Sequence, residues 1–149
     1  MADVVTNAFL EGQAVGQIDF NNDSFRCALF HIVPRPSDSD MIDVVSYGQL
    51  SANEVPPGNG YETYGVSVVT SAYIDPTTKD VVYACSTPSW VASAGDIGPF
   101  NYAAFYDVTV DNTVVYIYDF LKDYLANDGG SMKINIDSNG LIRAKRSCS

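Results

Sequence analysis

The stretch Met132-Lys133-Ile134-Asn135-Ile136-Asp137 has the clearest periodicity in the chain. Apolar and polar side chains alternate strictly along it, as on a strand with one buried and one solvated face. Because successive side chains of a strand point to opposite faces, this period of two predicts a β-strand. The turn formers Asp137-Ser138-Asn139-Gly140 follow and predict a turn into a short final strand over residues 141–144.

Similar segments occur upstream, rich in the β-branched and aromatic residues that strands favour. Strands are predicted over residues 25–31, 64–74, 81–85, 102–110 and 113–120. The second and third of these form one predicted hairpin. The last two form another, with Asp111-Asn112 at its turn.

Other segments depart from the strand period. Apolar spacings of three and four predict a short helix from Asp3 to about Gln13. Proline and glycine predict loops over residues 33–40 and 56–61 and a break over residues 95–99. Residues 41–47 fit either a strand or a short helix.

These elements together predict an all-β fold. About seven or eight strands separated by turn signals indicate a β-sandwich or jelly roll with a short N-terminal helix. The absence of a repeat, a linker or a low-complexity block predicts a single domain over residues 1–149. Within it we expect a helical arm over residues 1–15 and a flexible basic tail over residues 144–149.

Charge limits the partners. The formal net charge is −10, and a field of that sign repels phosphate backbones, so we expect no nucleic-acid partner. Four of the few basic residues come late in the chain: Lys133, Arg143, Lys145 and Arg146. This cluster fits either a local docking patch or a solvated tail.

The absence of a secretion signal and the spacing of the cysteines predict synthesis in a reducing cytoplasm. Met1-Ala2-Asp3 carries an acid where a signal peptide carries bases, and no apolar run is long enough for a membrane span. We therefore expect no membrane partner. Cys27 and Cys85 lie in strand-like runs, so we expect them to be small core residues. Cys148 lies in the tail, where we expect a free thiol.

The sequence offers little for catalysis or cofactor binding. His31 is the only histidine, so all histidine-based acid–base chemistry would depend on it. Asp19-Phe20-Asn21-Asn22-Asp23 begins like a calcium loop, but Ser24 stands where the glycine belongs, and an Asn/Asp turn is the favoured interpretation. We therefore expect a protein that is not an enzyme and holds no cofactor or metal.

Aromatic side chains are the main candidates for contact with a partner. Tyrosine combines an apolar ring with a polar hydroxyl, which suits an interface. The runs Tyr102/Phe105/Tyr106 and Tyr116/Tyr118/Phe120 favour core and interface positions over a ligand-stacking platform for sugars or bases. The interface candidates are Asn59, Tyr61, Trp90, Tyr102 and Tyr106.

Several segments in order resemble a known family. They are residues 7–12, residues 23–29, the loop Gly58-Asn59-Gly60-Tyr61, residues 103–107 with the strand over 114–120, and residues 132–143. This order resembles small structural proteins of tailed bacteriophages, including cyanophage-like ones, over residues 7 to 143. The resemblance implies a virion component, with a capsid cement or decoration protein as the leading expectation.

The resemblance also implies partners and a location. Such proteins are often trimers on the outer capsid surface, so the expected partners are further copies of this chain in a homotrimer and the major capsid protein. The chain departs from the family in residues 33–40 and in its tail, residues 145–149, which leaves the docking surface open. Three alternatives stay open: a tail adaptor or fibre-associated protein, a carbohydrate-binding module, and an enzyme that uses only carboxylates.

Overall fold

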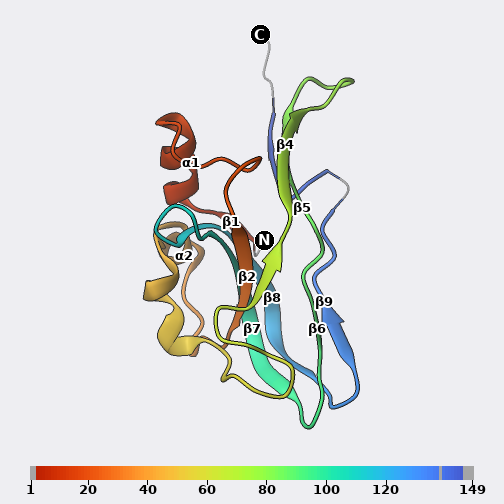
Figure 1. Cartoon of the computed structure of the whole chain (residues 1–149). Helices are drawn as coiled ribbons and strands as arrows, with labels where there is room; N and C mark the ends of the chain where they lie inside the picture. The colour runs from red at the N-terminus through yellow and green to blue at the C-terminus, as the bar shows by residue number, and fades with distance from the viewer. Residues whose placement is uncertain (1–2, 138, 146–149) are drawn as a thin grey trace.

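The computed structural model describes residues 3–137 and 139–145. Strands make up 42% of the chain and helices 13%, the strands pair antiparallel, and the helices include a short N-terminal one, which confirms the predicted all-β class (Figure 1). The strands are β1 Val4–Val5, β2 Phe25–Phe30, β3 Val66–Val68, β4 Thr70–Ile74, β5 Val81–Cys85, β6 Ser89–Val91, β7 Ile97–Asp107, β8 Thr113–Ala126, β9 Ser131–Lys133 and β10 Ile142–Ala144. The helices are α1 Asn7–Ala14 and α2 Asp38–Ile42, with short 3-10 turns η1 Tyr47–Gln49 and η2 Ser51–Asn53.

The strands form two layers. One layer is a five-stranded antiparallel sheet in the order β1-β8-β7-β2-β3. The second layer contains a three-stranded sheet, β10-β5-β4, and a two-stranded sheet, β6-β9. Figure 1 shows β4 and β5 above β6 and β9, all on one side of the large sheet. This arrangement matches the sandwich that the strand pattern predicts.

The main core fills the space between the two layers. Cys27 and Leu29 of β2 and Phe105 of β7 face it, and Trp90 and Ile142 reach it from the second layer. These side chains are almost fully buried. Alternate residues of β2 and β7 therefore hold the second layer against the large sheet.

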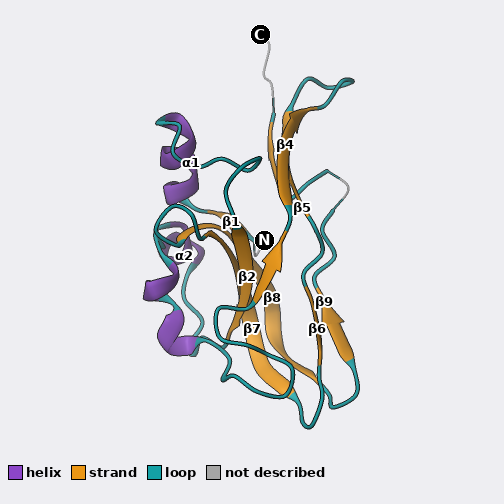
Figure 2. Ribbon diagram, in the orientation of Figure 1, coloured by secondary structure: helices purple, strands orange, loops and turns teal. Residues whose placement is uncertain are grey.

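A second core covers the opposite face of the large sheet. Figure 2 shows the helical segments gathered on that side. Met41 of α2 and Leu50 after η1 pack there with Phe30, Tyr102 and other buried residues of β2 and β7. Both faces of these two strands are consequently buried, which explains why they are apolar almost throughout.

The N-terminal segment is part of the fold rather than a projecting arm. Val4 and Val5 pair with Ile117 and Tyr116 of β8, so the predicted helix begins later than expected. The Thr6 hydroxyl accepts a hydrogen bond from the Phe9 backbone N–H at 3.1 Å, which caps α1. β-branched valines favour the strand, and the threonine cap determines where the helix can start.

The hairpin of β7 and β8 confirms the predicted turn at Asp111-Asn112. It also shows that one predicted chain break is part of a strand. Asp111 and Asn112 adopt positive φ values of 52° and 55°, as a tight hairpin turn requires. The predicted break over residues 95–99 is wrong, because β7 already begins at Ile97. Pro99 is tolerated there because the register with β8 shifts between Ile97 and Phe100.

The segment predicted as one strand over residues 64–74 serves both layers. Val68 pairs with Phe25 of the large sheet, whereas Thr70 pairs with Cys85 of the second layer. Val69 lies between the two pairings and is exposed. One continuous extended run therefore crosses from one sheet to the other.

The predicted alternation of buried and exposed side chains over residues 132–137 is confirmed. The predicted strand pairing is confirmed only in part. Ile134 is buried, while Lys133, Asn135 and Asp137 are exposed. Only Ser131–Lys133 is paired as a strand, with β6. The predicted final strand is present as β10.

The loop predicted over residues 33–40 ends earlier than expected. The Ser37 hydroxyl accepts a hydrogen bond from the Asp40 N–H at 3.2 Å, and this cap starts α2 at Asp38. Residues 41–47 fitted either a strand or a short helix in the sequence. In the structure, Met41 and Ile42 form the end of a short helix.

A glycine pair tests how closely the backbones of β2 and β3, neighbours in the large sheet, approach at the start of β3. Gly65 has φ +78°, and a Cβ added there would lie 1.9 Å from the Cys27 carbonyl oxygen. Gly16 has φ +73° but nothing within 4 Å. We expect Gly65→Ala to lower the free energy of unfolding by about 3 kcal/mol or more, and Gly16→Ala by about 1 kcal/mol. Urea unfolding followed by Trp90 fluorescence measures both, and equal losses would contradict the steric argument.

Candidate interaction surfaces

Four of the five predicted interface residues are buried in the interior of the folded protein. Tyr61, Trp90, Tyr102 and Tyr106 are 1–3% exposed. Trp90 packs near the Tyr61 ring, with centroids 6.2 Å apart. Side chains this deeply buried have almost no surface to give to a partner, so these rings act as core residues of this chain.

Glu54 explains how buried tyrosines satisfy their hydroxyl groups. Its carboxylate accepts hydrogen bonds from the Tyr61 hydroxyl at 2.6 Å and from the Tyr47 hydroxyl. The Tyr64 backbone N–H donates to it at 2.9 Å. Burial raises the pKa of Tyr61 above its ordinary value, so the ring stays a neutral donor. No local sequence pattern links Glu54 to these tyrosines, so sequence analysis missed this cluster.

Asn59 is the only one of the five on the surface. Its side-chain amide donates to the Asp96 carbonyl at 3.0 Å, and its φ is 58°. The adjacent Gly60 lies so close to Val91 that an added Cβ would be 2.0 Å from the Val91 carbonyl oxygen. The Gly-Asn-Gly-Tyr loop is therefore fixed against β6.

The segment from Val66 to Gly95, which supplies β3 to the large sheet and β4, β5 and β6 to the second layer, differs in charge from the rest of the molecule. Between Val66 and Gly95 the only charged residues are Asp75, Lys79 and Asp80, in a chain with net charge −10. Arg143 of β10 pairs with Asp75 at 2.7 Å and with Asp80 at 2.9 Å. We call this segment, residues 66–95, the neutral layer, because its two carboxylates are matched by Arg143 and Lys79.

The neutral layer also exposes apolar side chains. Val69 is 77% exposed, Val91 62%, Ile74 60% and Tyr73 48%. Contact between two proteins is easiest where apolar area is exposed and no charge must be desolvated. Tyr73 and Ile74 are neighbours in β4 and therefore point to opposite faces of the strand. The neutral layer is one candidate for a protein interface.

Part of the predicted basic cluster serves the fold instead. The Arg143 guanidinium is held by Asp75 and Asp80, so it anchors β10 to the β4–β5 hairpin. Lys145 is exposed at the end of the described chain. Arg146 and Cys148 lie outside the described residues.

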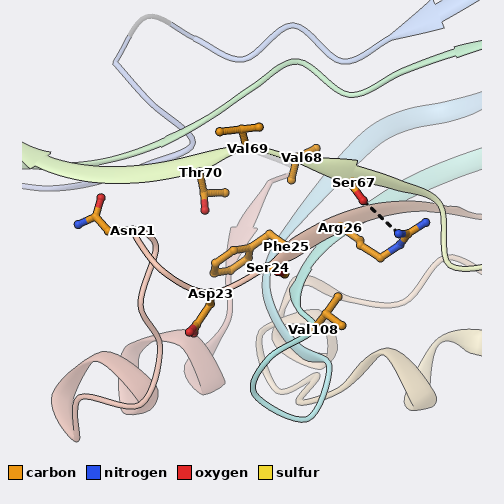
Figure 3. A pocket seen from close by; sticks show the side chains of 10 residues that line it. All are labelled: Asn21, Asp23, Ser24, Phe25, Arg26, Ser67, Val68, Val69, Thr70 and Val108. Atoms are coloured by element: carbon orange, nitrogen blue, oxygen red, sulfur yellow. Dashed lines mark hydrogen bonds between the residues drawn. The ribbon is translucent and has the colours of Figure 1, made fainter.

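A groove of about 500 Å³ opens where the strand crossing at Val69 leaves β2 (Figure 3). Asp23 and Arg26 lie on either side of Phe25 along it. The Arg26 guanidinium donates to Ser67 Oγ at 3.1 Å, to the Gly65 carbonyl at 2.6 Å and to the Tyr64 carbonyl at 3.2 Å. Arg26 thus fixes the turn before β3, and its charge is already engaged within the chain.

A pair of carboxyl groups lies at the end of β7 beside this groove. Asp107 is 0% exposed, and its Oδ1 accepts the backbone N–H groups of Thr109 and Val110. Its other oxygen, Oδ2, has no partner that donates to it among the described residues. Burial, followed by the hydrogen bond and the charge of Asp23, raises the pKa of the Asp107 carboxyl to about 8. The buried oxygen without a donor therefore favours the protonated, neutral form of the Asp107 carboxyl.

The calcium-like segment is an Asn/Asp turn, as the sequence favoured. Asp19 Oδ1 accepts the Asn21 backbone N–H at 2.9 Å, and Oδ2 accepts the Asn22 amide at 2.7 Å. No group of three His, Cys, Asp or Glu side chains that could hold a metal ion occurs within residues 3–137 and 139–145. His31 lies at the surface, with Nε2 3.0 Å from Asp123 Oδ2.

Comparisons with known proteins do not identify a relative. No protein-family model, curated protein or solved structure matched the chain. In the described part of the chain, no helix is long and apolar enough to cross a membrane.

The buried acid predicts a pH-dependent stability. The folded pKa of Asp107 is about 8 and its ordinary value is 3.8, so the folded state holds one extra proton between these values. The free energy of unfolding should therefore fall as the pH rises from 4 to 8, by up to about 1.4 kcal/mol per pH unit. Asp107→Asn keeps a donor for Asp23 and should remove this slope. The exposed Asp40→Asn is the control, and urea unfolding at several pH values measures all three proteins. An unchanged slope in Asp107→Asn would show that another group is responsible.

Proposed function

We propose that this chain is a structural subunit of a phage virion that docks on other protein surfaces, most simply as a capsid cement or decoration protein. The observation that carries the proposal is the neutral layer, which exposes apolar side chains in an otherwise acidic molecule. The resemblance to phage structural proteins supplies the virion and the outer surface of the major capsid protein as the place of docking.

Charge supports docking through this layer rather than elsewhere. Eighteen acidic residues face eight basic ones in the whole chain, so most of the surface repels other acidic proteins and further copies of itself. The neutral layer avoids that repulsion, because Arg143 neutralises the carboxylates that flank the β4–β5 hairpin. Self-association into a homotrimer and docking on a capsid both fit a surface of this kind.

The engaged charges elsewhere support a structural role. Arg26 is bound to the turn before β3, and Asp107 is fully buried without contact with solvent. These groups stabilise the ends of β2 and β7 rather than facing a ligand. A tail adaptor or fibre-associated role would use the same neutral layer, so position on the particle separates the two proposals.

Location on the particle is the first test. Virions assembled from the genome that encodes this chain are labelled with gold-conjugated antibodies raised against it. We expect label on the heads. Label confined to tails would move the protein to the tail, and purified virions without label would refute the virion role.

A charge placed on the neutral layer tests the docking surface. We expect Val69→Glu to reduce binding to particles that lack this gene product by tenfold or more, because the new carboxylate must be desolvated in the contact. Val15→Glu is the matched control, since Val15 is 62% exposed at the end of α1. Co-sedimentation measures bound copies, and equal binding of both variants would exclude Val69 from the interface.

A further inference from the structure

The two layers stay apart along one side of the sandwich. β1 pairs with β8 only at Tyr116 and Ile117, and within the described residues no strand pairs with that edge of β8 beyond them. The opposite wall is residues 131–137 and 139–141, of which β9 pairs only with β6. Figure 1 shows β8 in the large sheet and β9 in the second layer. We call the space between these two walls the seam.

Two hollows lie in line along the seam. One, of about 400 Å³, is lined by Phe120 and Tyr124 of β8 and by residues 131–133. The other, of about 240 Å³, is lined by Tyr116 and Tyr118 of β8 and by residues 135–137 with Gly140 and Leu141. The same two walls therefore form both hollows.

Aromatic rings form a row along the β8 wall. Tyr116, Tyr118 and Phe120 are alternate residues, so they share one face of the strand at intervals of about 7 Å. All three are half-buried, and Tyr124 is 44% exposed. The Tyr118 and Phe120 rings are 4.9 Å apart, and those of Phe120 and Tyr124 are 5.8 Å apart. The planes of neighbouring rings are inclined by 64° and 61°, so the row offers successive apolar surfaces at different angles rather than one flat platform.

Polar groups border the rings. Asp3 accepts a hydrogen bond from the Tyr116 hydroxyl at 2.9 Å and thereby orients that ring. The exposed Asn135 amide lines the seam and has no hydrogen-bond partner within the described part of the chain. Asp137 uses one carboxylate oxygen for the Asn139 N–H at 2.8 Å. An amide that donates and accepts beside a carboxylate that accepts is suited to the hydroxyl groups of a ligand.

We propose that the seam binds a neutral oligosaccharide. Its sugar rings would stack on the β8 aromatics, and its hydroxyl groups would bond to Asn135 and Asp137. Asp3 and Asp137 line one hollow and Lys133 lines the other, while the Lys122 ammonium lies 5.1 Å from the centre of the Tyr124 ring. Because two carboxylates and two ammonium groups border the seam, neither an anionic nor a cationic ligand is favoured. A polyanion would meet the net charge of −10, which also excludes nucleic acid as the stacked ligand.

This site is separate from the docking surface proposed above. The seam is formed by β8 and by residues 131–137 and 139–141, whereas the docking proposal uses the neutral layer, residues 66–95. Glycan binding and virion location are measured in different assays, so either proposal can fail while the other holds.

A glycan array probed with the labelled full chain is the first experiment. We expect hits among neutral oligosaccharides of several sugars, with weaker signals for the single sugars, because one sugar covers only one ring. Hits restricted to acidic or sulfated glycans, or no hits at all, would overturn the proposal.

Variants then locate the site. We expect Tyr118→Ala and Tyr124→Ala each to weaken binding of the best array hit by tenfold or more in calorimetric titration. Tyr73→Ala is the matched control, because Tyr73 is 48% exposed in the neutral layer and should leave binding unchanged. Tyr118→Phe keeps the ring and should retain most of the affinity, which separates stacking from a loss of folding.

Self-association is the competing use of the seam. If a second copy of the chain fills it, Tyr124→Ala should abolish an oligomer seen by light scattering, and no glycan should bind. That result would overturn the proposal, as would equal glycan affinities for Tyr118→Ala and Tyr73→Ala.

Discussion

The structure depends on burying both faces of the paired strands β2 and β7. Apolar side chains leave both faces of this pair, so one layer of protein must cover each face. The helical segments after β2 cover one face and the second layer, β4, β5, β6, β9 and β10, covers the other. The edges of the large sheet are left to β1 and β3, and the short β1 leaves most of the β8 edge unpaired. The seam therefore lies at the edge of the sheet, because the apolar residues are concentrated in its central strands.

Local sequence patterns predicted those features of the fold that depend only on residues close together in the sequence. The alternation at residues 132–137 predicted which side chains are buried, and Asp111-Asn112 predicted a hairpin. Partner choice depends on distant residues, so sequence analysis did not show that residues 64–74 divide between two sheets. The same limit applies to the surfaces. The aromatic row on β8 is visible as a period of two, but the wall opposite it and the burial of Tyr61 and Trp90 depend on the whole fold.

Charge divides the surface into regions with different uses. Acidic side chains dominate the composition, yet the segment of residues 66–95 carries almost none and Arg143 neutralises those that flank its hairpin. The seam carries charges of both signs at opposite ends. An acidic protein can in this way stay soluble at high concentration while keeping two regions where contact costs little electrostatic free energy.

The strand crossing at Val69 has a mechanical consequence. Because Val68 is paired in one sheet and Thr70 in the other, sliding one layer past the other would have to break strand pairing on one side of Val69. A load applied to one layer is therefore transmitted directly to its neighbour instead of being absorbed by sliding. In the capsid role proposed above, such coupling would let the two layers share a mechanical load.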